Sequence, residues 1–93
     1  MPVLYTQLRL CSAGGGFEAV PVRRLALDLR RVRAELEARA AAVVDARVML
    51  IVTVEGVEAT ISRAGRLLFK TGDSEAARRA FAFLEPLLGL PSR

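Results

Sequence analysis

The sequence predicts an α+β fold: a two-layer sandwich in which two helices cover one face of a mostly antiparallel, four-stranded sheet. Two stretches, residues 18–41 and 74–88, repeat apolar side chains at intervals of three and four, which is typical of amphipathic helices. A length of 93 residues predicts a single domain. The predicted order of elements is β-α-β-β-β-α, and a right-handed crossover through the first helix places both helices on one face of the sheet. The stretches that alternate apolar and polar side chains, as half-buried strands do, are residues 2–12, 43–55, 57–62 and 67–71.

The first predicted strand, residues 2–12, ends at three consecutive glycines. Along this strand Tyr5 falls opposite the leucines, so we expect its side chain to point away from the helices. Gly14, Gly15 and Gly16 form either a flexible connection or a close approach between two backbones. A glycine-rich link from a strand into a helix can also point backbone N–H groups at a phosphate, which makes these glycines a candidate anion-binding loop. The loop lacks the GxGxxG spacing of the specific motif.

The first helix is predicted over residues 18–41. Pro21 suits its first turn, where a missing N–H removes no intrahelical hydrogen bond. Oppositely charged residues alternate along the other side at helical spacing, which is typical of a solvated face. The apolar stripe expected to face the sheet consists of Val22, Leu25, Leu29, Val32 and Leu36.

Residues 43–55 are predicted to form one central strand, because they are rich in β-branched side chains and end at a glycine. Apolar side chains occur on both of its faces, with Met49 and Ile51 at the centre of the face turned away from the helices. A strand buried on both faces at its centre has this pattern. The side chains expected to face the helices are Val48, Leu50, Val52 and Val54.

The rest of the chain predicts two tight turns and a second helix. Gly56 and Gly65 are placed at the turns of a three-strand meander. The register of the last strand stays open, so either Leu67 and Phe69 or Leu68 and Lys70 face away from the helices. Asp73 or Ser74 is expected to cap the final helix, and Pro86 to bend its last turn.

The predicted sheet face that no helix covers holds the candidate functional residues. A contiguous apolar patch on such a face usually marks an interface or a ligand site. We therefore predict a non-enzymatic module that forms a homodimer face to face. The alternative is a nucleic-acid-binding module that uses the same face. In it Tyr5 would stack on a base, and the residues meeting phosphates would be Arg9, Arg47 and Lys70. The residues expected on this face are Tyr5, Arg9, Arg47, Met49, Ile51 and Leu68.

The composition argues against several classes of protein. The 14 basic residues exceed the 10 acidic ones, but the two kinds are interleaved and form no basic block. The absence of histidine excludes histidine-based triads and mixed Cys/His zinc sites, and no cofactor or metal is predicted. A lone Cys11 cannot form an internal disulfide, which favours a reducing, cytoplasmic location. The longest apolar run, residues 48–52, is far shorter than a membrane span of about 20 residues, so no membrane partner is expected.

The C-terminal third has a turn glycine with a basic residue, a strand that ends in Thr-Gly, and a helix that opens near a serine; these residues are Gly65, Arg66, Thr71, Gly72, Ser74 and Ala80. This strand-to-helix portion resembles a repeat of the TATA-binding-protein family. That resemblance implies a curved sheet used for binding DNA, or other partners in single-repeat relatives. The chain has one repeat, so a continuous saddle would need a dimer, and it lacks the paired phenylalanines that wedge base steps. The element order is also similar to that of the small dimerising subunit of the KEOPS tRNA-modification complex.

Overall fold

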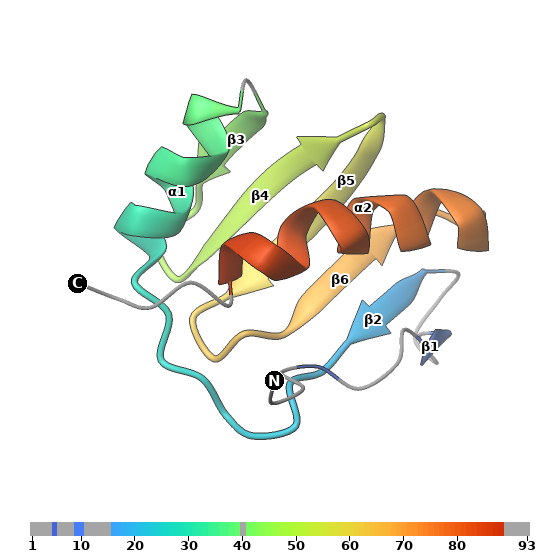
Figure 1. The fold of residues 1–93 in the computed structure, drawn as a ribbon, viewed down its shortest axis with the longest axis horizontal. Helices are drawn as coiled ribbons and strands as arrows, with labels where there is room; N and C mark the ends of the chain where they lie inside the picture. Colours follow the sequence, from blue (N-terminus) through green and yellow to red (C-terminus); the bar gives the residue numbers. More distant parts are fainter. Residues whose placement is uncertain (1–4, 6–8, 11–15, 40, 89–93) are drawn as a thin grey trace.

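The computed structural model describes residues 5, 9–10, 16–39 and 41–88, and it is an antiparallel sheet with two helices (Figure 1). The α+β class and the two helices are therefore confirmed. The strand count of four is wrong, because the described residues alone form a sheet of six strands, one of them only two residues long. The elements in chain order are β1 (Arg9–Leu10), β2 (Phe17–Ala19), α1 (Leu29–Ala38), β3 (Ala42–Asp45), β4 (Met49–Val54), β5 (Val57–Ser62), β6 (Leu67–Lys70) and α2 (Ser74–Leu88).

The strands lie in the order β1-β2-β6-β5-β4-β3, and every neighbouring pair is antiparallel. Strands β4, β5 and β6 form the predicted meander. Its first turn is the two-residue loop Glu55–Gly56, in which φ is 50° and 81°, the left-handed pair of a type I′ hairpin. Figure 1 shows both helices on the same face of the sheet, with α1 beside β3 and β4 and α2 crossing the middle of the sheet.

The segment between Gly16 and α1 differs from the helix predicted over residues 18–41. Residues 17–19 are strand β2, which pairs with β6, and residues 24–28 are irregular. The N–H groups of Leu25 and Leu27 donate to the carbonyls of Ala64 and Arg63, both at 2.9 Å. These bonds to the β5–β6 turn replace the intrahelical bonds of the first two predicted turns. The helix begins only after Asp28, whose carboxylate accepts from the next free N–H groups as an N-cap.

Residues 43–55 form two strands and not the single one predicted. β3 and β4 pair from Ala42↔Thr53 to Asp45↔Leu50, joined by residues 46–48. The Asp45 carboxylate accepts from the Arg47 N–H at 2.8 Å, and Arg47 adopts φ 72°. Val48, predicted to face the helices, lies in this connection and is 65% exposed. The connection contains neither glycine nor proline, so the sequence signal for a turn here is Asp45, the last residue of β3.

The core lies between the sheet and the helices. Leu50, Val52 and Val54 are buried as predicted, and so are Val32 and Leu36 of α1. Helix α2 begins after Asp73, whose carboxylate accepts from the N–H groups of residues 75 and 76. Its predicted apolar stripe packs into the same core, with buried side chains at Ala77, Ala80, Leu84, Leu87 and Leu88.

The last strand takes one of its two predicted registers. Leu67 and Phe69 are buried in the core, whereas Leu68 is half-buried and Lys70 is exposed. Leu68 therefore lies on the sheet face away from the helices. The reason is the pairing of β6 with β5, which sets Phe69 beside the buried Ala59 and Leu68 beside Thr60.

Candidate functional site

The candidate site is the sheet face that lies away from both helices, here called the open face. Side chains alternate along each strand, and residues opposite one another on neighbouring strands share a face, so the register assigns its members. The predicted residues Met49, Ile51 and Leu68 all lie on it. The residues of β3 to β6 on the open face are Ala42, Val44, Met49, Ile51, Thr53, Glu58, Thr60, Ser62, Leu68 and Lys70.

The centre of the open face is apolar. Val44, Ile51, Thr60 and Leu68 form one continuous cross-strand row from β3 to β6. Met49 lies beside this row, and next to it is a shallow hollow of about 160 Å³ whose lining includes Met49 and Leu68. A cavity of about 150 Å³ accepts a group the size of benzene, so the hollow has room for one apolar side chain.

Charged residues on the open face pair with one another. Lys70 forms an ion pair with Glu58 at 3.1 Å, across the β5–β6 pairing. Arg66 donates from Nε and Nη2 to a single oxygen of Glu18, at 3.0 and 2.7 Å. Glu18 is only 7% exposed although it is charged, which is tolerated because the guanidinium satisfies it. Among its described side chains, the open face therefore combines an apolar centre with charges that pair within one copy.

Sequence reasoning missed Val44 and the ion pair between Glu18 and Arg66. Val44 was placed in the same strand as Met49, where it would have pointed toward the helices. The turn at residues 46–48 reverses the chain and sets Val44 opposite Ile51, where it is 60% exposed. Glu18 was placed in a helix, and no local pattern could have paired it with a residue 48 positions away.

Tyr5, predicted on the open face, is a core residue. It is 3% exposed, forms an isolated bridge with Pro21, and packs edge-on against Phe81 with ring centroids 5.6 Å apart. Its hydroxyl donates to the Gly65 carbonyl at 2.6 Å. Burial, with a smaller contribution from the negative charge of Glu85, raises the pKa of the Tyr5 hydroxyl well above its usual value of 10. A ring held in this way cannot stack on a base from the open face.

The two arginines predicted on the open face lie elsewhere or at its margin. Arg47 lies in the β3–β4 connection and not in a strand, so it is not part of the open face. Arg9 belongs to the short strand β1, where its backbone is in register with Glu18. The side chain of Arg9 lies outside the described part of the chain, as does Cys11.

The candidate anion-binding loop is described only at Gly16, since Gly14 and Gly15 lie outside the described residues. A Cβ atom at Gly16 would lie 2.6 Å from the Phe69 carbonyl oxygen. Gly16 is therefore required for a close approach of the backbone to β6, one of the two predicted roles. The segment that follows it is β2 and not a helix, so the helix N-terminus on which the phosphate prediction depended is not there.

The described residues contain no group of three or more His, Cys, Asp or Glu placed to hold a metal ion. Among the helices of the described chain, none is long and apolar enough to cross a membrane. Comparisons with protein-family models, with curated proteins and with solved structures each found no match. The resemblances to the TATA-binding-protein repeat and to the KEOPS subunit therefore stay predictions.

Proposed function

We propose that the protein is a non-enzymatic module, arranged as a two-layer sandwich, that forms a homodimer by packing the open faces of two copies together. The observation that carries the proposal is a cross-strand row on a face over which neither helix lies. The row is apolar except for the Thr60 hydroxyl, has Met49 beside it, and consists of Val44, Ile51, Thr60 and Leu68. Burial of apolar surface is the main favourable term in protein association. A contiguous apolar patch on a small domain therefore favours a partner.

A second copy suits the pattern of charges on this face. In a symmetric dimer the same surface meets itself, so unpaired charges of one sign would be brought together. Here Lys70 pairs with Glu58 and Arg66 with Glu18 inside each copy, so two such faces can approach without like-charge repulsion. The exposed Val44 of one copy is also of suitable size for the hollow beside Met49 of the other.

The size of the face predicts a weak dimer. The patch on β3 to β6 is four strands wide and at most six residues long, so it measures roughly 19 by 20 Å, or about 380 Å² in projection. Stable interfaces bury about 800 Å² of accessible surface on each partner, and the relief of the side chains closes only part of this difference. We therefore expect a reversible, concentration-dependent dimer with a dissociation constant roughly in the micromolar range.

Analytical ultracentrifugation over a range of concentrations tests the proposal. Ile51→Lys places an unpaired charge in the centre of the face, and we expect it to give a monomer at every concentration. Val22→Lys is the control, because Val22 is also β-branched but is exposed and lies outside the strands, whereas Ile51 is half-buried. A wild-type monomer at millimolar concentration, or equal effects of the two substitutions, would contradict the proposal.

The nucleic-acid alternative stays a prediction with fewer residues to support it. Of the residues named for it, Tyr5 is buried and Arg47 lies off the open face, while Lys70 already pairs with Glu58. Binding to a single-stranded oligonucleotide at low salt, with a steep loss of affinity as salt rises, is the result it requires. The absence of such binding at low salt would dismiss it.

A further inference from the structure

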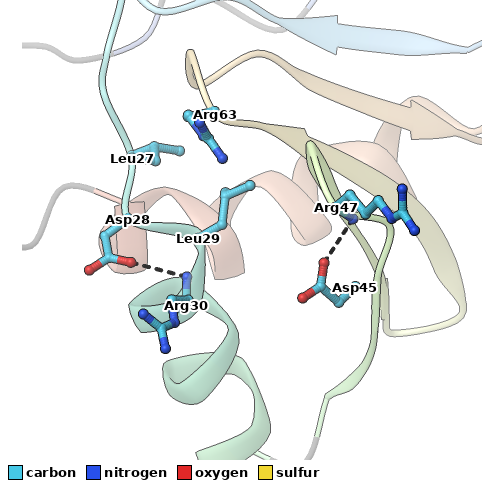
Figure 2. Close-up of a pocket in the computed structure, with 7 residues that line it drawn as sticks. All are labelled: Leu27, Asp28, Leu29, Arg30, Asp45, Arg47 and Arg63. Atoms are coloured by element: carbon cyan, nitrogen blue, oxygen red, sulfur yellow. Dashed lines mark hydrogen bonds between the residues drawn. The ribbon is translucent and has the colours of Figure 1, made fainter.

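A second surface feature, separate from the open face, is a groove of about 530 Å³ between the start of α1, the β3–β4 connection and the β5–β6 turn. We infer that this groove, here called the arginine groove, binds the phosphate group of a small phosphorylated molecule. Its volume falls in the range of about 300–1,000 Å³ that small-molecule sites occupy. Figure 2 shows Asp28 and Arg30 on one side of the groove, Asp45 and Arg47 on the other, and Arg63 above them.

The three arginines of the groove come from three separate segments that backbone contacts hold in place. Arg30 lies in the first turn of α1, Arg47 in the β3–β4 connection and Arg63 in the β5–β6 turn. The Arg63 carbonyl accepts from the Leu27 N–H at 2.9 Å, which ties two of the groove walls together. The Arg47 backbone is held by Asp45 in a left-handed conformation that an arginine rarely adopts.

The carboxylates of the groove are already engaged, whereas its guanidinium groups are not. Asp28 accepts from the Arg30 N–H at 3.1 Å, and Asp45 accepts from the Arg47 N–H and pairs with Arg33 at 3.5 Å. Within the described residues, no ion pair involves the side chain of Arg30, Arg47 or Arg63. Their guanidinium groups are therefore available to an anion.

The chemistry of the groove favours a single phosphate group on a small molecule. A guanidinium donates two parallel hydrogen bonds to phosphate oxygens, which gives both strength and orientation. All three arginines are exposed, and Arg47 extends outward in Figure 2. Binding therefore requires the arginine side chains to turn toward the groove. Such rotamer changes of exposed side chains take picoseconds to nanoseconds. Asp28 and Asp45 also line the groove, so an extended nucleic-acid backbone would bring more than one phosphate close to a carboxylate, whereas a single phosphate group can lie on the arginines. Between them, half-buried Leu27 and Leu29 offer an apolar contact to the rest of a small ligand.

The test is an NMR titration of the full 93-residue chain at constant ionic strength, with inorganic phosphate, adenosine monophosphate and a single-stranded oligonucleotide as separate probes. We expect saturable shifts at the arginine groove with phosphate and with the nucleotide, and tighter binding of the nucleotide. Arg47→Gly removes the guanidinium and suits the left-handed backbone, so this variant should fold normally and bind about tenfold more weakly. Arg63→Ala also removes a guanidinium group, and we expect it to weaken binding by a similar factor.

Arg79→Ala is the matched control, because Arg79 is also exposed but lies on α2, outside the groove. We expect this variant to bind like the wild type. The inference is overturned by the absence of saturable shifts, by an equal loss in Arg79→Ala and the groove variants, or by binding of the oligonucleotide alone. Far-UV circular dichroism of each variant separates lost binding from lost folding. Ile51→Lys tests dimerisation through the open face, whereas the arginine variants test phosphate binding in the arginine groove. Either proposal can therefore fail without the other.

Discussion

Tyr5→Phe is the substitution whose effect the structure defines best. It removes one oxygen atom from the core and keeps the ring that packs edge-on against Phe81. That oxygen donates a buried hydrogen bond of 2.6 Å to the Gly65 carbonyl, 60 positions away in the chain. The bond ties the N-terminal segment to the β5–β6 turn, so its loss should weaken the whole fold and not a local segment.

The expected magnitude follows from what the substitution leaves behind. Phenylalanine fills the same space, so no cavity forms, but the Gly65 carbonyl loses its buried donor. A buried polar group without a partner costs about 1–3 kcal/mol. In a domain of this size each kcal/mol shifts the melting temperature by about 4–8 °C, so we expect Tyr5→Phe to melt roughly 10 °C lower than the wild type.

Urea denaturation followed by far-UV circular dichroism measures this free energy directly. We expect a lower midpoint with an unchanged slope, because the surface exposed on unfolding is nearly the same. Thr53→Val is the control: it also removes a hydroxyl, but from an exposed position on β4, and should change the free energy of unfolding by less than about 0.5 kcal/mol. Equal stabilities of Tyr5→Phe and this control would refute the reasoning.

Three further outcomes follow from the same structure. Burial raises the pKa of the Tyr5 hydroxyl above its value in the unfolded chain, which is near 10, so the neutral phenol contributes its full stability below that pH and loses it as the pH rises further. The absorbance of this sole tyrosine should therefore report ionisation only together with loss of helical circular dichroism. A phenol that titrates near 10 in a folded chain would contradict this prediction. Gly16→Ala places a Cβ atom against the Phe69 carbonyl and should lower the free energy of unfolding by about 1–3 kcal/mol, measured by urea denaturation; wild-type stability would show that the backbone there moves easily. Asp28→Ala removes the N-cap of α1 and should cost about 1 kcal/mol in the same assay, whereas Asp28→Asn, which keeps an acceptor oxygen, should cost much less; equal losses would argue against the cap.

The elements that sequence reasoning placed correctly are those whose signals are local. The type I′ turn at Gly56 needs left-handed backbone at two adjacent positions, and a glycine there is visible in the sequence. The stripe of α2 and its capping by Asp73 likewise depend on residues within one or two helical turns. For the same reason Met49 and Ile51 were placed on the correct face of their strand.

The errors occurred where contacts between distant segments override local preference. The first helix was predicted too early because Val22 and Leu25 fit a helical period with Leu29. The N–H groups of Leu25 and Leu27 instead bond to the β5–β6 turn. Tyr5 was assigned by alternation to the open face, although a bond to Gly65 holds it in the core. In both cases the deciding partner lies far away in the sequence, where no periodicity can reveal it.

The amino-acid sequence alone determined the α+β class, the two amphipathic helices and the apolar pair Met49 and Ile51, because binary patterning depends on residues that are close neighbours. Only the tertiary structure decided the strand order, the addition of Val44 to the open face and the gathering of Arg30, Arg47 and Arg63 around one groove. The physical reason is that strand pairing is a long-range choice. A turn at Asp45 that reverses the chain changes which side chains face each other, while the local pattern of the sequence stays the same.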